Sequence, residues 1–357
     1  MTIALLSAAS SVHTIRWANA FVQRGQRVHL ITLHAPGAGL DPGVSVHRLP
    51  FLGGLGYLLN GPRLAKLLRS LAPDVVNAHY ATGYGTLARW CVGIPVVLNV
   101  WGSDVYAFPG KSILHHRLVL RNLLAANHLV STSEDMASRT RSLASMPLPI
   151  TVVPFGVDTD LFRPKNPGDD DGPITIGTVK TLEPVYGVDL LVEAYIRLCG
   201  MEDLPQIRLR VTGAGTELHR LEQALRSAGL AHRAFFAGAV PYEQVPAELA
   251  ELDIYVALSR AESFGVAVIE ASACGLPVVV SNVGGLHEVV DDGVTGLVVP
   301  ADDVEAAVVA LGKLLRSPDL RHRMGKAGRS LVKERFAWDR CVDRMLEVLE
   351  QVQRSGA

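Results

Sequence analysis

Short runs of β-branched and apolar residues alternate with longer amphipathic segments along this chain, and the alternation restarts after one interruption. This rhythm indicates repeated βα units, because parallel strands need a crossover connection that a helix usually supplies. In the first half, strands are expected near Ile3–Ser7, Arg27–Leu33, Val44–Arg48, Asp74–Ala78, Val96–Val100, His128–Thr132 and Ile150–Val153. Helices are expected between them, for example at Thr14–Arg24 and Arg63–Leu71.

The interruption, Phe162–Pro173, is rich in Pro, Gly and Asp and is typical of a linker. The rhythm then resumes. Strands are expected near Ile174–Val179, Ile207–Thr212, Ala234–Phe236, Ile254–Leu258, Val278–Ser281 and Gly296–Val299, and the last helices near Val304–Leu315, Leu320–Phe336 and Asp339–Gln353. A chain of 357 residues suits two domains, each of about 150–200 residues.

We therefore predict an α/β fold with two Rossmann-like domains facing a cleft. The predicted domains are residues 1–165 and residues 172–336. A C-terminal helix follows at 337–357, and one arrangement for it is to pack back on the first domain. In such sheets ligands bind at the carboxyl ends of the strands. The loops that follow the strands are therefore the places where functional residues are expected.

Charge is distributed unevenly between the two halves. Residues 1–165 hold 15 Lys and Arg against 7 Asp and Glu, whereas the rest of the chain holds 19 against 28, for a net charge of −1. The basic half indicates an anionic partner, such as a phosphorylated acceptor or a membrane surface. The alternative is two ordinary solvated surfaces that balance each other.

The four cysteines, Cys91, Cys199, Cys274 and Cys341, are far apart and form no Cys-x-x-Cys pair, so neither a metal site nor a disulfide framework is expected. No apolar run reaches the roughly 18 residues that a spanning helix needs. We expect a cytoplasmic protein. An alternative is peripheral contact with the inner face of a membrane, made by the apolar loop Pro50–Leu59 and the basic segment Lys111–Arg121. Packing of the loop on itself and of the basic segment on the core would explain the same two stretches.

The densest group of polar residues follows the predicted strand Ile254–Leu258, where a helix is expected to open at Gly265. A helix N-terminus offers unpaired N–H groups and the positive end of a dipole, which suits a diphosphate. Glu262 precedes this helix and Glu270 lies inside it, where a carboxylate can accept hydrogen bonds from a vicinal diol such as ribose. Taken by spacing alone, both could equally be surface glutamates.

Glu262 and Glu270, with the continuation Ala271–Val279, closely resemble the signature of the retaining glycosyltransferases of family four, which have the GT-B fold. Other motifs of that family are matched in order: Trp101–Asp104 for the acceptor-side loop, Pro154–Phe162 for the inter-domain crossover, and Val283–Glu288 and Asp292–Pro300 for the tail motifs. The resemblance covers nearly the whole chain, and its order is more specific than any single motif.

The resemblance implies roles by position for the second half. Glu262 would contact hydroxyls of the donor sugar and Glu270 would hold the ribose. The backbone around Ser263, Phe264, Gly265 and Val266 would serve the sugar or the diphosphate, and the turn at Gly213 would lie near the nucleotide. Lys180 stands where the family usually has Arg and would contact the diphosphate, whereas Tyr186 occupies the place of an expected Lys. A second cation would then come from Arg260 or Arg16.

In the first half the implied roles concern the acceptor and the phosphate. His79 and Asp104 are predicted acceptor-side residues, although a lone His is more often structural, and Trp101 stands where the family often has His. Ser11 lies in a loop of small residues that suits a backbone phosphate nest or an ordinary helix cap.

The predicted activity is retaining sugar transfer from a nucleoside diphosphate sugar to a hydroxyl acceptor, by a front-face mechanism, in bacterial-type polysaccharide or glycolipid synthesis. No cofactor and no metal are expected, because no Asp-x-Asp triplet of the metal-bridging type is found. The expected partners are the donor and the acceptor, lipid-linked in one alternative, and no nucleic acid. A nucleotide-sugar epimerase and a catalytically silent nucleotide-sugar-binding protein are the alternative functions. A dehydrogenase is disfavoured, because Leu218 replaces the last glycine of the dinucleotide fingerprint that begins at Gly213.

Overall fold

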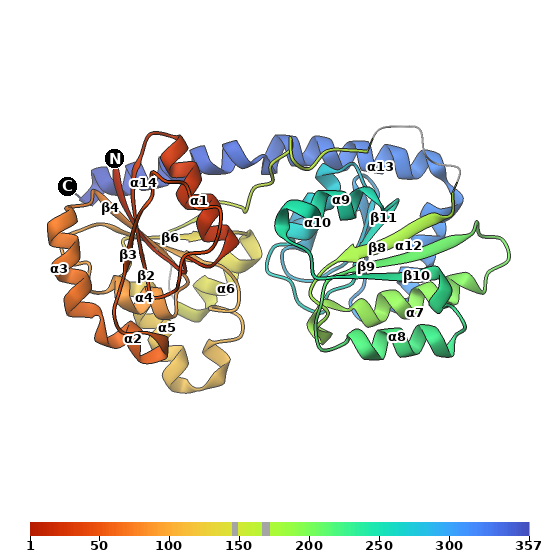
Figure 1. Ribbon diagram of the computed structural model, residues 1–357, viewed down its shortest axis with the longest axis horizontal. Coiled ribbons are helices and arrows are strands. Elements are labelled where there is room, and N and C mark those ends of the chain that lie inside the picture. Colours follow the sequence, from red (N-terminus) through yellow and green to blue (C-terminus); the bar gives the residue numbers. More distant parts are fainter. Residues whose placement is uncertain (145–148, 166–171, 357) are drawn as a thin grey trace. The chain divides into compact units, whose positions relative to one another are not determined.

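The computed structural model describes residues 1–144, 149–165 and 172–356. The chain divides into two compact units, one formed by Met1–Pro154 with Cys341–Ala357 and the other by Phe155–Arg340 (Figure 1). Residues 166–171 of the predicted linker lie outside the described residues.

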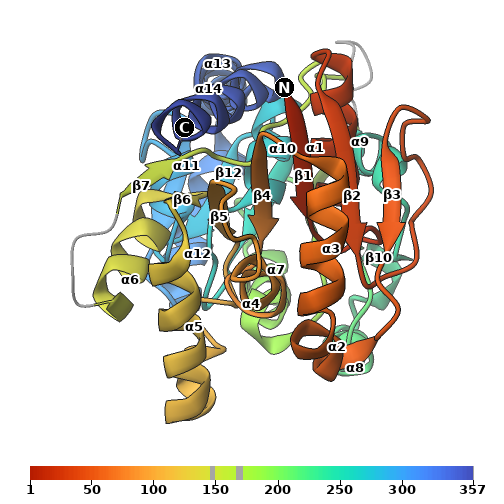
Figure 2. The ribbon, with the colours of Figure 1, turned by 90° about the vertical axis from the view of Figure 1, so that its left-hand side faces the viewer.

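The first unit contains a seven-stranded parallel sheet with the order β3-β2-β1-β4-β5-β6-β7, which Figure 2 shows from β3 at the right to β7 at the left. Its strands are β1 (Thr2–Leu6), β2 (Arg27–Thr32), β3 (Ser45–Arg48), β4 (Val75–His79), β5 (Val96–Val100), β6 (His128–Ser131) and β7 (Ile150–Val152). Its helices are α1 (Val12–Gln23), α2 (Gly53–Leu59), α3 (Gly61–Leu71), α4 (Gly83–Ala88), η1 (Pro109–Lys111), α5 (Ile113–Ala125) and α6 (Glu134–Ala144), together with most of α14 (Trp338–Gly356).

The second unit contains a six-stranded parallel sheet with the order β10-β9-β8-β11-β12-β13. Its strands are β8 (Ile174–Val179), β9 (Ile207–Thr212), β10 (Ala234–Gly238), β11 (Ile254–Ala257), β12 (Val278–Ser281) and β13 (Gly296–Val299). The helices are η2 (Pro184–Tyr186), α7 (Val188–Cys199), α8 (Leu218–Ser227), η3 (Ala231–Arg233), η4 (Tyr242–Gln244), α9 (Val245–Ala250), α10 (Val266–Ala273), α11 (Leu286–Val289), α12 (Val304–Arg316), α13 (Pro318–Leu331) and the π-helical turn η5 (Val332–Phe336).

The two sheets share one topology. In each, the order reverses beside the first strand, so that β1 lies between β2 and β4, and β8 lies between β9 and β11. At such a reversal the two connections leave toward opposite faces, and a crevice opens outside the carboxyl ends of the strands. The fold class predicted from the alternating pattern, two Rossmann-like α/β units, is confirmed. The carboxyl ends of β8 and β11 are therefore where the second unit would hold a ligand.

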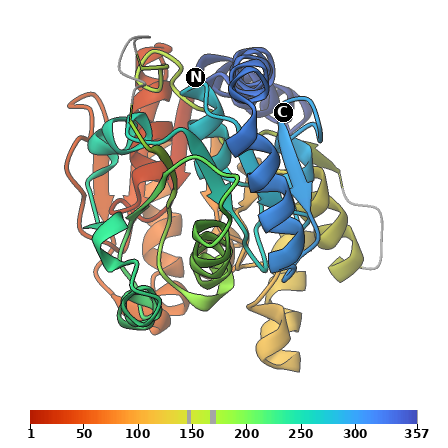
Figure 3. The same cartoon turned by 90° about the vertical axis from the view of Figure 1, so that its right-hand side faces the viewer.

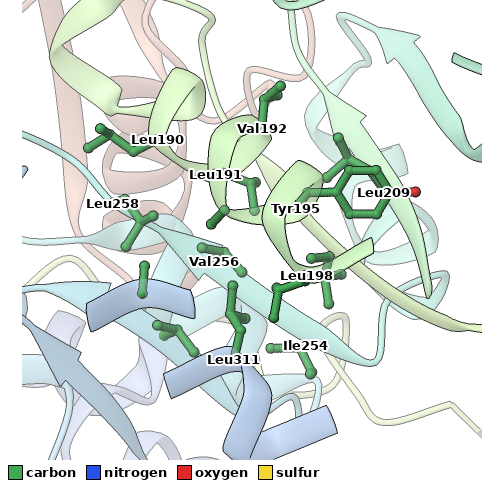
Figure 4. Packing of buried hydrophobic residues seen from close by; sticks show 14 of the residues in the cluster. Leu190, Leu191, Val192, Tyr195, Leu198, Leu209, Ile254, Val256, Leu258 and Leu311 are labelled. Atoms are coloured by element: carbon green, nitrogen blue, oxygen red, sulfur yellow. The ribbon is translucent and has the colours of Figure 1, made fainter. Parts of the chain in front are cut away.

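The core of the second unit fixes these two strands. Leu191 and Tyr195 of α7 pack against Val256 of β11 and Leu311 of α12, and all four side chains are buried (Figure 4). Helices α7 and α12 lie side by side over this face of the sheet, as Figure 3 shows in green and blue. Because helices cover both faces, strands such as β12 are buried at every position instead of alternating between buried and exposed residues.

Candidate functional site

Two opposite charges meet at the strand-order reversal of the second unit. Lys180 directly follows β8, and Glu262 lies in the loop that follows β11. The Lys180 Nζ and Glu262 Oε2 atoms are 2.5 Å apart, and the side chains are 15% and 12% exposed. Although 82 positions separate the two residues, β8 and β11 are parallel neighbours, so their carboxyl ends open at the same edge of the sheet.

The surroundings of Lys180 keep it charged. Burial disfavours the ammonium, but the carboxylate of Glu262 outweighs this effect and holds the pKa of Lys180 above its ordinary value. The ring of Tyr186 adds a second contact, with its centroid 4.5 Å from Lys180 Nζ. Lys180 therefore carries a positive charge at neutral pH, and its ammonium contacts both a carboxylate and the face of an aromatic ring.

Glycines hold the backbone around this pair. Gly213 has a φ of +146°, and a Cβ atom there would lie 1.9 Å from the carbonyl oxygen of Lys180. Gly284 has a φ of +47°, and its Cβ would lie 1.8 Å from the carbonyl oxygen of Glu262. Only glycine permits such close approach of two backbones. Gly213, predicted to lie near the nucleotide, therefore also supports the backbone of Lys180.

Helix α10 starts beside Glu262. Its N-cap residue is Gly265, with a φ of +101°, and no side chain caps the helix start in the described chain. Phe264 is only 2% exposed and packs its ring against Phe336 at 5.7 Å, so it can offer a ligand only its backbone. Glu270 lies inside α10 and is 6% exposed. Ser263, Phe264, Gly265 and Val266 thus form one continuous segment that leads from Glu262 into the helix.

Arg260, considered above as a second cation, is engaged in structural contacts. Its Nη1 and Nη2 atoms donate to the two carboxylate oxygens of Asp189, each at 2.9 Å, and Nη1 also donates to the carbonyl oxygen of Pro184. Its Nε atom donates to Asp302 at 2.7 Å. These partners raise the pKa of Arg260, and the hydrogen bond that it donates to Asp189 contributes most. The guanidinium ties the loop after β11 to α7 and η2.

In the first unit, His79 lies at the end of β4 and is fully buried. Its Nδ1 atom is 2.9 Å from the hydroxyl of Ser7, which is 2.7 Å from the hydroxyl of Thr14, and its ring centroid is 4.2 Å from that of Trp101. Burial, and then the nearby His13, lower the pKa of His79 to about 3. His79 is therefore neutral at pH 7, and its Nε2 atom has no hydrogen-bond partner among the described residues.

Asp104 orders the loop that follows β5. Its carboxylate accepts hydrogen bonds from the backbone N–H groups of Ala81 at 2.8 Å, Trp101 at 3.1 Å and Gly102 at 2.9 Å. Burial raises the pKa of Asp104, although these hydrogen bonds oppose the shift. The carboxylate thus ties its own loop, after β5, to the loop after β4. Ser11 is the N-cap residue of α1, and its side chain makes no capping hydrogen bond.

Asp158 and Asp160 have the spacing of an Asp-x-Asp triplet within the crossover segment. The Oδ1 atom of Asp158 accepts from the N–H groups of Asp160 and Leu161, each at 3.0 Å, which is a local turn contact. Over residues 1–144, 149–165 and 172–356, no group of three or more His, Cys, Asp or Glu side chains is placed to hold a metal ion.

Comparison with known proteins identifies the family. A family model described as glycosyl transferases group 1 matches residues 160–331, and one described as glycosyl transferase 4-like matches residues 2–133. A GDP-mannose-dependent alpha-(1-6)-phosphatidylinositol monomannoside mannosyltransferase of Mycolicibacterium smegmatis is 30% identical over 364 residues, which is 92% of each chain. The chain belongs to the group 1 glycosyltransferases. A D-inositol 3-phosphate glycosyltransferase of Xylanimonas cellulosilytica is 29% identical over 96% of this glycosyltransferase and 92% of its own length.

Solved structures show the same fold for this group 1 glycosyltransferase. Sucrose-phosphate synthase of Thermosynechococcus elongatus matches with a TM-score of 0.83 and 21% identity, over 99% of this chain and all of that one. Anabaena HepE in complex with UDP matches with a TM-score of 0.82 and 18% identity, over 98% of this chain and all of that one. The chain therefore has the GT-B architecture of two Rossmann-like units.

The sequence did not reveal two features of the glycosyltransferase's site. One is the contact between Lys180 and Tyr186, and the other is the double hydrogen bond between Arg260 and Asp189. For the first, the usable signal was that Tyr186 occupies the place of an expected Lys, since an aromatic ring there can still bind a neighbouring ammonium. For the second, the only signal in the sequence was the opposite charge of Arg260 and Asp189.

Proposed function

We propose that this glycosyltransferase retains anomeric configuration and transfers a hexose from a nucleoside diphosphate sugar to a hydroxyl acceptor. The observation that carries the proposal is the Lys180–Glu262 pair at the strand-order reversal, beside the uncapped start of α10. A fixed ammonium and a helix N-terminus together favour a bound diphosphate. A carboxylate next to them can accept hydrogen bonds from sugar hydroxyls.

Each residue has one role in the proposed reaction. Glu262 binds hydroxyls of the donor sugar, Lys180 and the start of α10 bind the diphosphate, and Glu270 binds the ribose. The bond between the anomeric carbon and the diphosphate oxygen breaks, and its electron pair stays on the diphosphate. The acceptor oxygen forms its bond on the same face, and its proton passes to an oxygen of the departing diphosphate. Lys180 stabilises the charge that this diphosphate gains.

We propose a GDP-sugar as the first donor to test, because the Mycolicibacterium relative is named as GDP-mannose-dependent. The names of the relatives also suggest a phosphorylated or lipid-linked cyclitol acceptor, and hence glycolipid synthesis. Such an acceptor would suit the excess of Lys and Arg over Asp and Glu in residues 1–165.

Peripheral contact with an anionic membrane is part of this proposal. On α2 and just before it, Leu52, Leu55, Leu58 and Leu59 are 53–70% exposed, and Ile113 and Leu114 at the start of α5 are 63% and 70% exposed. Both helices lie toward the end of the view to which the strand arrows point in Figure 2. Lys111, Arg117 and Arg121 are exposed beside the apolar residues of α5. Apolar side chains flanked by cations suit the surface of an anionic bilayer. Within the described chain, no helix has the length and apolar character needed to cross a membrane.

The activity is tested with purified protein and a panel of GDP-, UDP- and ADP-sugars. The donor that raises the melting temperature most is then supplied with candidate acceptors, and the product is examined by NMR. We expect transfer with the anomeric configuration of the donor. An inverted product would refute the retaining mechanism, and unchanged turnover in Glu262→Ala would refute the site. Flotation with anionic liposomes tests the membrane contact, which should weaken as salt rises.

A further inference from the structure

Tyr186 lies where the family resemblance places a second lysine, and its ring faces the first one. The ring centroid is 4.5 Å from Lys180 Nζ, and the Glu262 carboxylate contacts the same ammonium at 2.5 Å. We propose that Tyr186 is a positioning residue whose ring holds the Lys180 ammonium in place for the donor diphosphate. This inference rests on the proposed function, since it assigns Lys180 to the diphosphate.

The turn that carries Tyr186 is attached to the loop that carries Glu262. The backbone N–H of Arg260 donates to the carbonyl oxygen of Val185 at 2.8 Å, and the Arg260 guanidinium donates to the carbonyl oxygen of Pro184 at 2.5 Å. The same guanidinium holds both carboxylate oxygens of Asp189 in the first turn of α7. Bidentate pairs of this kind fix geometry as well as contributing energy. Arg260 thus holds turn η2 directly, at Pro184 and Val185, and also through the helix that follows it.

Gly187 brings the turn against the end of β11. Its φ is +62°, and a Cβ atom there would lie 1.8 Å from the carbonyl oxygen of Leu258. The absence of a side chain lets the backbone that follows Tyr186 touch the strand from which the Glu262 loop departs. Lys180, Tyr186 and Glu262 therefore keep fixed positions relative to one another through backbone contacts within one unit.

An aromatic ring does what a second lysine would not. A lysine side chain has a flexible four-carbon stem, and ordering it on binding costs entropy. A second ammonium at position 186 would repel that of Lys180, whereas the electron-rich face of a ring attracts it. The ring therefore restricts Lys180 before the ligand arrives. We place the Lys180 ammonium at the phosphate that a nucleoside diphosphate has and a monophosphate lacks, so the gain should appear in diphosphate binding and not in the binding of the nucleoside.

The test compares Tyr186→Leu with Tyr186→Phe by isothermal titration calorimetry. The ligands are GDP, GMP, UDP, UMP, ADP and AMP, and the measured quantity is the ratio of the monophosphate dissociation constant to the diphosphate dissociation constant for the same base. We expect Tyr186→Leu to lower this ratio about fivefold, with monophosphate affinity changing less than about twofold. Tyr186→Phe keeps the ring and should keep the ratio of the wild type. Tyr186→Met replaces the leucine variant if circular dichroism shows that the latter does not fold.

The outcomes separate the inference from the function on which it rests. If the wild type binds none of the diphosphates GDP, UDP and ADP, the proposed donor site is wrong. If the wild type binds a diphosphate and the ratio is unchanged in Tyr186→Leu, only the positioning role is overturned. The same conclusion follows if Tyr186→Phe loses as much as Tyr186→Leu, because the hydroxyl and not the ring would then be responsible.

Discussion

Lys180 and Glu262 form an ion pair of 2.5 Å at the carboxyl ends of two neighbouring parallel strands, with both side chains mostly shielded from water. Removing one partner should leave the other charge poorly solvated. We expect Lys180→Met and Glu262→Gln each to lower the free energy of unfolding by about 2 kcal/mol, less than for a fully buried pair because some solvent reaches both groups. Urea titrations of the two variants measure this loss.

The double variant and a matched control make this prediction sharp. Lys180→Met combined with Glu262→Gln should regain part of the lost stability, while transfer stays about 100-fold below the wild type. The ion pair of Lys165 with Asp253, at 3.1 Å, is more exposed, so Lys165→Met should cost less than about 1 kcal/mol. Strictly additive losses in the double variant would show that the Lys180–Glu262 pair is not coupled.

The positions of the strands were predictable because a parallel sheet covered on both faces leaves compact apolar runs between amphipathic segments. Prediction was weaker where the local pattern changes gradually. One helix was expected over Leu320–Phe336, whereas α13 ends at Leu331 and a π-helical turn follows. The predicted strand Ala234–Phe236 extends to Gly238 through a register shift. Such irregularities depend on tertiary packing that periodicity does not encode.

The composition of the candidate site was easier to predict than its contacts. The sequence indicates that Lys180 and Glu262 each come directly after a strand or in the loop behind one. Their contact can be inferred only once β8 and β11 are known to be neighbours in the sheet. Asp104 is an example in the first unit. The resemblance predicts an acceptor-side role for Asp104, and this stays a prediction; its carboxylate accepts two backbone hydrogen bonds from its own loop and one from Ala81, in the loop after β4. A motif gives the residue type and the place, but not the direction of the side chain.

His79 should make the stability of the protein depend on pH. Its pKa falls from the ordinary 6.5 to about 3 in the fold. A group with a lowered folded pKa contributes stability that is present above its unfolded pKa, and this is lost as pH falls toward the folded value. Between pH 6.5 and pH 3 the unfolding midpoint in urea should therefore drop. The contribution of one imidazole is at most about 1.4 kcal/mol per pH unit.

The variant His79→Gln tests the source of this dependence. It removes the titrating group, so its unfolding midpoint should fall less steeply with decreasing pH than that of the wild type. Part of the slope should persist, because burial also lowers the pKa of His13 to about 4. Identical slopes in the variant and the wild type would show that His79 is not the buried neutral group proposed here.

Removal of metal ions should leave the transfer rate nearly unchanged. In the proposed reaction Lys180 and the start of α10 stabilise the charge of the leaving diphosphate, which a divalent ion does in other enzymes. Rates measured in EDTA should agree with untreated rates within about twofold. A loss of activity in EDTA that Mg²⁺ or Mn²⁺ restores would show that a metal takes part and that Lys180 is insufficient.

Gly284→Ala should disturb the site more than its size suggests. The added Cβ would lie 1.8 Å from the carbonyl oxygen of Glu262, at a φ of +47°. The backbone of Glu262 must move, so we expect both weaker diphosphate binding and a lower melting temperature. Gly229→Ala is the matched control, because Gly229 has a φ of +72° but no atom within 4 Å of the added Cβ. The control should lose only about 1 kcal/mol of stability, because an alanine is strained in the left-handed region. It should keep its diphosphate affinity. Calorimetric titration of both variants with GDP and UDP measures the diphosphate affinities. Equal affinities in Gly284→Ala and Gly229→Ala would show that the backbone position of Glu262 does not control donor binding.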